Sequence, residues 1–142
     1  METAAKSIMA LDVGNRRIGV ALADSLAKLA HPLTTIERSD DSPMLIKELS
    51  ERYGVVKLIV GRPRGLSGQN TPQTEQTLQF VGQLKAQVKI PIELQDEALT
   101  SVLAEKELAS RRSSYKKADI DALAATYILE DYLTSHPGDT HV

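Results

Sequence analysis

The chain has 142 residues, of which 17 are Lys or Arg and 19 are Asp or Glu, and its net charge at pH 7 is -2. A chain of this length can fold as one domain without disulfides or metal. It contains no cysteine, which excludes disulfides, thiolate catalysis and Cys-ligated zinc. The charge balance excludes a uniformly basic protein, so any nucleic-acid binding must use a local basic patch.

The N-terminal residues lack an apolar signal core, and no run approaches the roughly 20 apolar residues that a membrane helix requires. We therefore expect a cytoplasmic protein with a single domain over residues 1–133 and a disordered tail over residues 134–142. Two of the three histidines lie in that tail. A histidine-rich metal site is therefore not expected.

Three strands are predicted near the start of the chain, at residues 7–12, 16–24 and 29–36. Their short connections favour an antiparallel meander. Pro32 places the third strand at an edge, because proline cannot donate to a ladder. The second strand has a bulky face and a small face against which a helix can pack closely. These faces are Ile18, Val20 and Leu22, and Gly19, Ala21 and Ala23.

Helices and strands alternate in the rest of the chain. Strands are predicted at residues 55–61 and 91–97, a polar loop at 62–70, and helices at 43–53, 72–88, 100–109 and 119–133. Three antiparallel strands followed by two right-handed crossovers give an α/β fold. This fold has a mixed five-stranded sheet, three antiparallel then two parallel strands, with helices on both faces. The pattern is compatible with a ribonuclease H-like architecture.

Acidic residues from distant parts of the sequence are predicted to meet at one edge of this sheet. The first strand is central and parallel to the strands that end at Gly61 and Glu97, so their carboxyl ends gather Asp12 and Glu97. Asp121, in the first turn of the last helix, can reach the same edge. Clustered carboxylates repel one another unless a cation lies between them, and hard oxygen ligands suit Mg²⁺ or Mn²⁺. Such a site predicts metal-dependent cleavage of nucleic acid.

Each acidic residue also has a purely structural explanation. Asp12 can shape the turn at Gly14, Asp121 can interact with the helix dipole, and Glu97 can be a solvated strand end. The coincidence of all three at matched positions favours the site.

A basic segment precedes Asp121, and its charges either solubilise a loop or bind the phosphates that leave the metal site. Its aromatic residue, Tyr115, can stack on a base. The predicted nucleic-acid-binding residues are Arg16, Arg17, Arg62, Arg64, Arg111, Arg112, Tyr115, Lys116 and Lys117.

Four blocks resemble, in order and spacing, the YqgF (RuvX) family of bacterial pre-16S rRNA nucleases. The blocks are DVGNRRIGVA at 12–21, IVGRP at 59–63, DEALTS at 96–101 and DIDALAA at 119–125. The resemblance covers about residues 8–133 and implies a ribonuclease H-like fold related to Holliday junction resolvases. It also implies trimming of the 5′ end of the 16S rRNA precursor. By motif, the implied catalytic and metal-binding acids are Asp12, Glu97 and Asp121.

Two positions depart from the family pattern. Ala98 stands where an arginine usually follows the Asp-Glu pair, and Arg62 stands where leucine is typical. We hypothesise that Arg62 restores a positive charge near the scissile phosphate.

Several alternatives remain open. The chain can be a DNA nuclease that resembles Holliday junction resolvases, or a catalytically weak nucleic-acid-binding factor in ribosome assembly or transcription. A phosphate-binding lobe of an actin-like ATPase is a further alternative, which the lack of a second Asp-x-Gly strand pair disfavours. The sequence leaves open whether the protein is a monomer or a homodimer.

Overall fold

The structure, a computed structural model, describes residues 6–26, 28–111 and 117–136. The five strands are β1 (Ser7–Val13), β2 (Arg17–Asp24), β3 (Ala30–Glu37), β4 (Val55–Arg64) and β5 (Ile92–Ala98). The helices within the described ranges are α1 (Ser42–Arg52), α2 (Pro72–Lys85), α3 (Leu99–Arg111) and α4 (Lys117–Ser135). No helix in these ranges is long and apolar enough to cross a bilayer.

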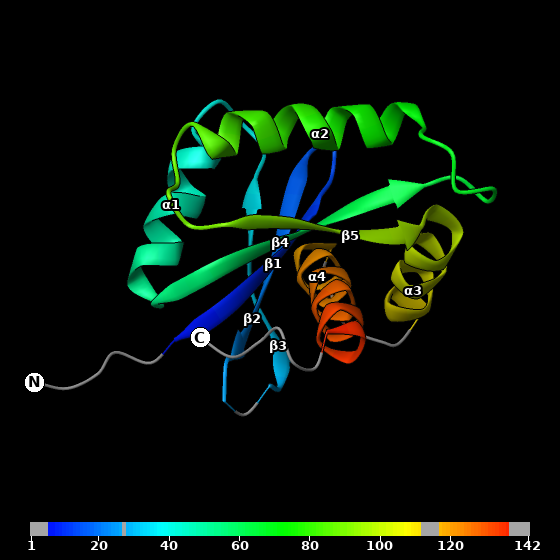
Figure 1. Ribbon diagram of the computed structural model, residues 1–142. Coiled ribbons are helices and arrows are strands. Elements are labelled where there is room, and N and C mark those ends of the chain that lie inside the picture. Colours follow the sequence, from blue (N-terminus) through cyan, green and yellow to red (C-terminus); the bar gives the residue numbers. More distant parts are fainter. Residues whose placement is uncertain (1–5, 27, 112–116, 137–142) are drawn as a thin grey trace, which may run out of the picture.

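The strands form one sheet in the order β3-β2-β1-β4-β5 (Figure 1). β2 is antiparallel to β1 and β3, whereas β4 is parallel to β1 and β5. The predicted mixed five-stranded sheet, with its first strand central and its third strand at an edge, is therefore confirmed.

Helices cover both faces of the sheet. In Figure 1, α2 lies above the sheet and α4 below it. The bulky face of β2, with Ile18 and Val20, packs in the core beneath α1 and α2, together with Phe80 of α2. The small face, with Ala21 and Ala23, packs against α4. The alternation of bulky and small side chains along β2 therefore lets α4 pack close to the sheet, as the sequence of β2 predicts.

β4 continues to Arg64, three residues beyond the end predicted at Gly61, so the first part of the predicted loop is a strand. Its pairing with β1 ends at Val60, but its pairing with β5 continues to Arg64 opposite Ala98. Beyond β1, no strand among the described residues pairs with this side of β4, so Pro63 costs no ladder hydrogen bond there.

α4 extends to Ser135, two residues beyond the end predicted at Leu133. The next residue, His136, stacks on Tyr132 with the ring centroids 4.3 Å apart. The start of the predicted tail is therefore ordered, and residues 137–142 lie outside the described ranges.

Candidate active site

Asp12 lies near the end of the central strand, where its side chain is 14% exposed. Burial raises the pKa of this carboxyl group, and the ammonium group of Lys106 partly offsets that effect. Lys106 Nζ lies 2.9 Å from Asp12 Oδ2, and no other polar partner of this oxygen is found among the described residues. Asp12 is thus a buried negative charge that depends on one neighbouring cation.

Asp121 reaches this point because of a glycine on the neighbouring strand. Gly19 pairs with Asp12 across β1 and β2. A Cβ atom added to Gly19 would lie 1.8 Å from the carbonyl oxygen of Asp121. Only a residue without a side chain allows α4 to approach β2 this closely. The glycine therefore brings the first turn of α4, and with it Asp121, beside Asp12.

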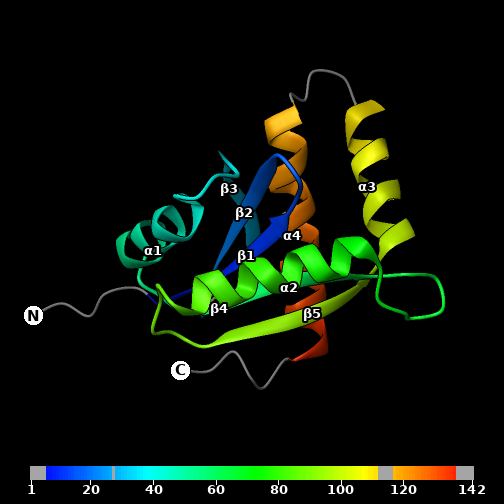
Figure 2. The same ribbon diagram turned by 90° about the horizontal axis from the view of Figure 1, so that it is seen from above.

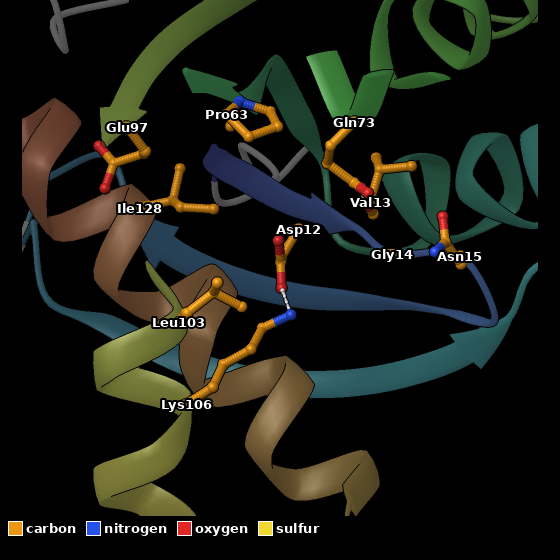
Figure 3. A pocket seen from close by; sticks show the side chains of 11 residues that line it. Asp12, Val13, Gly14, Asn15, Pro63, Gln73, Glu97, Leu103, Lys106 and Ile128 are labelled. Atoms are coloured by element: carbon orange, nitrogen blue, oxygen red, sulfur yellow. Dashed lines mark hydrogen bonds and ion pairs between the residues drawn. The ribbon is translucent and has the colours of Figure 1, made fainter. Parts of the chain in front are cut away.

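Two cations contact this pair of aspartates, and one of them is shared. Lys106 Nζ, 2.9 Å from Asp12 Oδ2, is also 3.7 Å from Asp121 Oδ1. Arg17 Nε donates to the other Asp121 oxygen, Oδ2, at 2.6 Å. The side chain of Asp121 is 12% exposed. Figure 3 shows Lys106 extending from α3 toward Asp12. Two carboxylates from β1 and α4 are thus held around one ammonium group.

Glu97 lines the same pocket as Asp12 and Lys106, a cavity of about 200 Å³. It comes from the end of β5, and Ile128 projects between it and Asp12 in Figure 3. Burial and a hydrogen bond with Asp131 raise the pKa of Glu97 to about 8, so it holds a proton at neutral pH. Within the described parts of the chain, no three His, Cys, Asp or Glu side chains lie close enough to hold a metal ion. The structure therefore brings Asp121 beside Asp12, whereas Glu97 lines the same pocket without joining them in a group of three.

Three of the predicted nucleic-acid-binding arginines, Arg17, Arg62 and Arg64, are paired with aspartates. Arg17 is paired with Asp121, as described, and Arg16 is exposed in the turn between β1 and β2. Arg62 Nε lies 2.5 Å, and Arg64 Nε 3.5 Å, from Asp96 Oδ1. Asp96 therefore compensates much of the charge that these two arginines bring to the end of β4.

The basic segment before α4 is described only in part. Arg111 forms an exposed ion pair of 2.7 Å with Glu107, one helical turn away. Lys117 begins α4, where only its backbone is described. Arg112, Tyr115 and Lys116 lie outside the described residues. The prediction that this segment binds phosphates thus stays a prediction.

Lys106 and Asp131 are the site residues that the sequence did not reveal. Lys106 is flanked by Glu105 and Glu107, a pattern typical of a solvated helix face. Asp131 lies near the C-terminal end of α4, and nothing in its spacing indicates a contact with Glu97. The first contact depends on where α3 lies relative to β1 and the second on where α4 lies relative to β5, and no local pattern encodes either.

The family model of RuvX, described as Holliday junction resolvase, matches residues 6–135. The chain belongs to the RuvX family. A relative from Moorella thermoacetica, named "Putative pre-16S rRNA nuclease", is 46% identical over 133 residues, which cover 89% of this chain and 93% of the relative. A relative of the same name from Roseiflexus sp. is 44% identical over 132 residues, covering 90% and 94%. The predicted family is thus confirmed.

A solved structure supports the fold of this RuvX-family chain. The crystal structure of the fowlpox virus Holliday junction resolvase superposes with a TM-score of 0.53 at 14% identity, covering 91% of this chain and 98% of that chain. At this identity the likeness concerns the fold alone, and it confirms the ribonuclease H-like architecture. RuvX is a family of nucleases, so nucleic acid is the substrate class.

Proposed function

We propose that this RuvX-family chain is a metal-dependent endonuclease that acts in the cytoplasm. Its reaction would process the 5′ end of the 16S rRNA precursor during ribosome biogenesis. The observation that carries the proposal is the buried pair of Asp12 and Asp121, which shares a cation beside a pocket at the carboxyl edge of the sheet. The names of its curated relatives favour this RNA substrate.

The residues of the pair fit a hard divalent cation. Asp12 and Asp121 already hold one positive charge between their oxygens, and carboxylate oxygens are the ligands that Mg²⁺ and Mn²⁺ prefer. When bound, such an ion would activate water and stabilise the leaving oxygen in phosphodiester hydrolysis.

Glu97 is the third acid in this proposal. Its carboxyl group holds a proton at neutral pH and bonds to Asp131. A cation nearby favours the ionised form of a carboxyl group. Glu97 would therefore join the site by releasing its proton and leaving Asp131.

The proposal is tested by a cleavage assay on two substrates. The first is a 16S rRNA precursor with its 5′ extension and the second is a four-way DNA junction, each with Mg²⁺, Mn²⁺ or EDTA. We expect cleavage of the RNA extension to require the metal. Asp12→Asn should lower the cleavage rate by about a hundredfold or more. Cleavage in EDTA, or by the folded Asp12→Asn variant at the wild-type rate, would contradict the proposal.

Resolution of DNA junctions is the second candidate, favoured by the description of the matched family. A resolvase must cut two strands, so it needs two active sites and hence a symmetric dimer. Paired cleavage of the junction by a dimer, with the RNA left intact, would select this function. Binding of either substrate without cleavage would instead select the catalytically weak binding factor.

A further inference from the structure

Lys106 lies where its charge serves both acidic residues of the site. Its ammonium nitrogen is within 3.7 Å of Asp121 Oδ1 and within 2.9 Å of Asp12 Oδ2. Its side chain is 26% exposed, so water screens this contact less than it screens a surface ion pair. Neither the proposed cleavage reaction nor the sequence motifs assign this lysine a role.

We infer that Lys106 is a built-in counter-ion of Asp12 and Asp121, which a divalent cation must displace in order to bind. The inference rests on the proposed function, because it takes these aspartates as metal ligands. An ammonium group and a divalent ion repel each other strongly at contact distance in a partly buried site. They therefore cannot both lie between the same two carboxylates, and Lys106 competes with the metal.

Arg17 does not compete in the same way. It donates to Asp121 Oδ2, whereas Lys106 contacts the other oxygen, Oδ1. It can therefore keep Asp121 oriented while the ammonium group leaves. The two cations thus have separate roles, with Arg17 as the positioning residue and Lys106 as the displaceable ion.

The surroundings of Lys106 allow it to leave. Lysine carries its charge on a flexible stem of four carbons. α3 also buries little apolar surface: among its described side chains Ala109 is buried, whereas Leu103 and Leu108 are 55% and 54% exposed. Figure 2 shows α3 at one side of the molecule, next to α4. Elements with few buried contacts move at low free-energy cost.

Mn²⁺ binding to the full-length chain, measured by calorimetry without nucleic acid, tests the inference. Lys106→Met should raise the affinity for Mn²⁺ by about tenfold or more, since the competing charge is gone. Lys85→Met, at an exposed position in the last turn of α2, removes the same charge far from the pocket. It should leave the affinity within about twofold of wild type.

A second measurement uses the wild-type chain and does not depend on the folding of any variant. Lysines are acetylated with an N-hydroxysuccinimide ester, with and without saturating Mn²⁺, and each site is quantified by mass spectrometry. If Mn²⁺ displaces the Lys106 ammonium group, it should raise the labelling of Lys106 severalfold and leave the labelling of Lys85 unchanged. Equal or lower labelling of Lys106 in Mn²⁺ would overturn the inference.

The outcomes separate this inference from the proposed function. If wild type and Lys106→Met bind Mn²⁺ equally, and Asp12→Asn abolishes binding in both, the metal site stands and the displacement of Lys106 is wrong. If neither chain binds Mn²⁺, the metal dependence in the proposed function fails, and the inference fails with it.

Discussion

Asp12 is a carboxylate whose burial disfavours its charged form, and a neighbouring cation offsets this effect. Burial raises the pKa of Asp12, and the Lys106 ammonium group opposes the rise. The sequence predicts the acid itself, because a charge at the end of a buried strand is rarely kept without a role. It does not predict the compensating lysine, which arrives from a helix more than 90 residues later in the chain.

Glu97 makes stability depend on pH. Its folded-state pKa is about 8, against an ordinary value of 4.5. Between these values the folded chain holds a proton that the unfolded chain has lost, so the free energy of unfolding falls as the pH rises. The stabilisation is complete below pH 4.5 and is lost as the pH passes 8.

We expect Glu97→Gln to remove this loss, since the amide cannot ionise. In EDTA the variant should match wild type at pH 5 and be more stable by about 1 kcal/mol at pH 9, a value reduced for the partial exposure of Glu97. Thermal unfolding across this pH range measures the effect. Glu48→Gln, at an exposed position of α1, is the control, and the prediction fails if both variants follow the wild-type profile.

We hypothesise that Arg62 supplies the positive charge that is missing at Ala98. Because Asp96 holds its guanidinium group, Arg62 must share or leave this partner to contact a phosphate. If it does, Arg62→Leu should slow cleavage by about tenfold, the effect of one charge-assisted hydrogen bond, and adding Ala98→Arg should restore the rate. Single-turnover cleavage checks this, and an unaffected Arg62→Leu variant or a failed rescue would refute compensation.

At the scale of elements, the site depends on how closely α4 packs on β2. The sequence predicts the last helix, but the size of its apolar side chains does not identify its buried face. Leu123 and Tyr127 are partly exposed, whereas Ala125 and Leu129 are buried completely. Alanines are weak hydrophobic signals, yet they are what fits against the small face of β2. This close packing is also what buries Asp121.

Gly19→Ala should therefore damage both the fold and the site. The new methyl group would overlap the Asp121 carbonyl, which we expect to destabilise the chain by about 2 kcal/mol. It should also slow cleavage, because α4 must shift away from Asp12. Thermal unfolding and cleavage rates measure the two effects.

Gly82→Ala is the matched control for this substitution. Gly82 lies in α2, and an added Cβ would meet no atom of the described residues within 4 Å. Alanine favours helix over glycine, so this variant should be slightly more stable than wild type, by about 0.5–1 kcal/mol. Equal effects of the two substitutions would show that close packing at Gly19 is not what positions α4.

At the scale of the whole molecule, the strand order could be predicted because the connections are short and crossovers are right-handed. Asp12 and Glu97 reach one edge of the sheet for that reason. The extension of β4 to Arg64 could not be predicted, because Pro63 reads as a strand end. The orientation of Glu97 toward Asp131 also escaped prediction, since it follows from tertiary packing and not from strand order.

The basic segment before α4 should make nucleic-acid binding sensitive to salt. If Arg111, Arg112, Lys116 and Lys117 contact phosphates of single-stranded RNA, replacing all four with Gln should reduce the slope of log K against log salt by about 3. Filter binding at several salt concentrations measures this slope. Replacement of Lys47 and Lys89, which line a pocket at the other edge of the sheet, is the control. An unchanged slope in the variant with all four replacements would place the phosphate contacts elsewhere.

The most direct test of the active site compares Asp12 and Asp121 with Asp119, which lies in the same helical turn as Asp121. Single-turnover cleavage of the 16S rRNA precursor in Mg²⁺ is measured for wild type, Asp12→Asn, Asp121→Asn and Asp119→Asn. Asp119 lies two residues before Asp121 but is exposed. We expect losses of about a hundredfold or more for Asp12→Asn and Asp121→Asn, and a near wild-type rate for Asp119→Asn. Folded Asp12→Asn and Asp121→Asn variants that cleave at the wild-type rate would contradict this assignment of the active site.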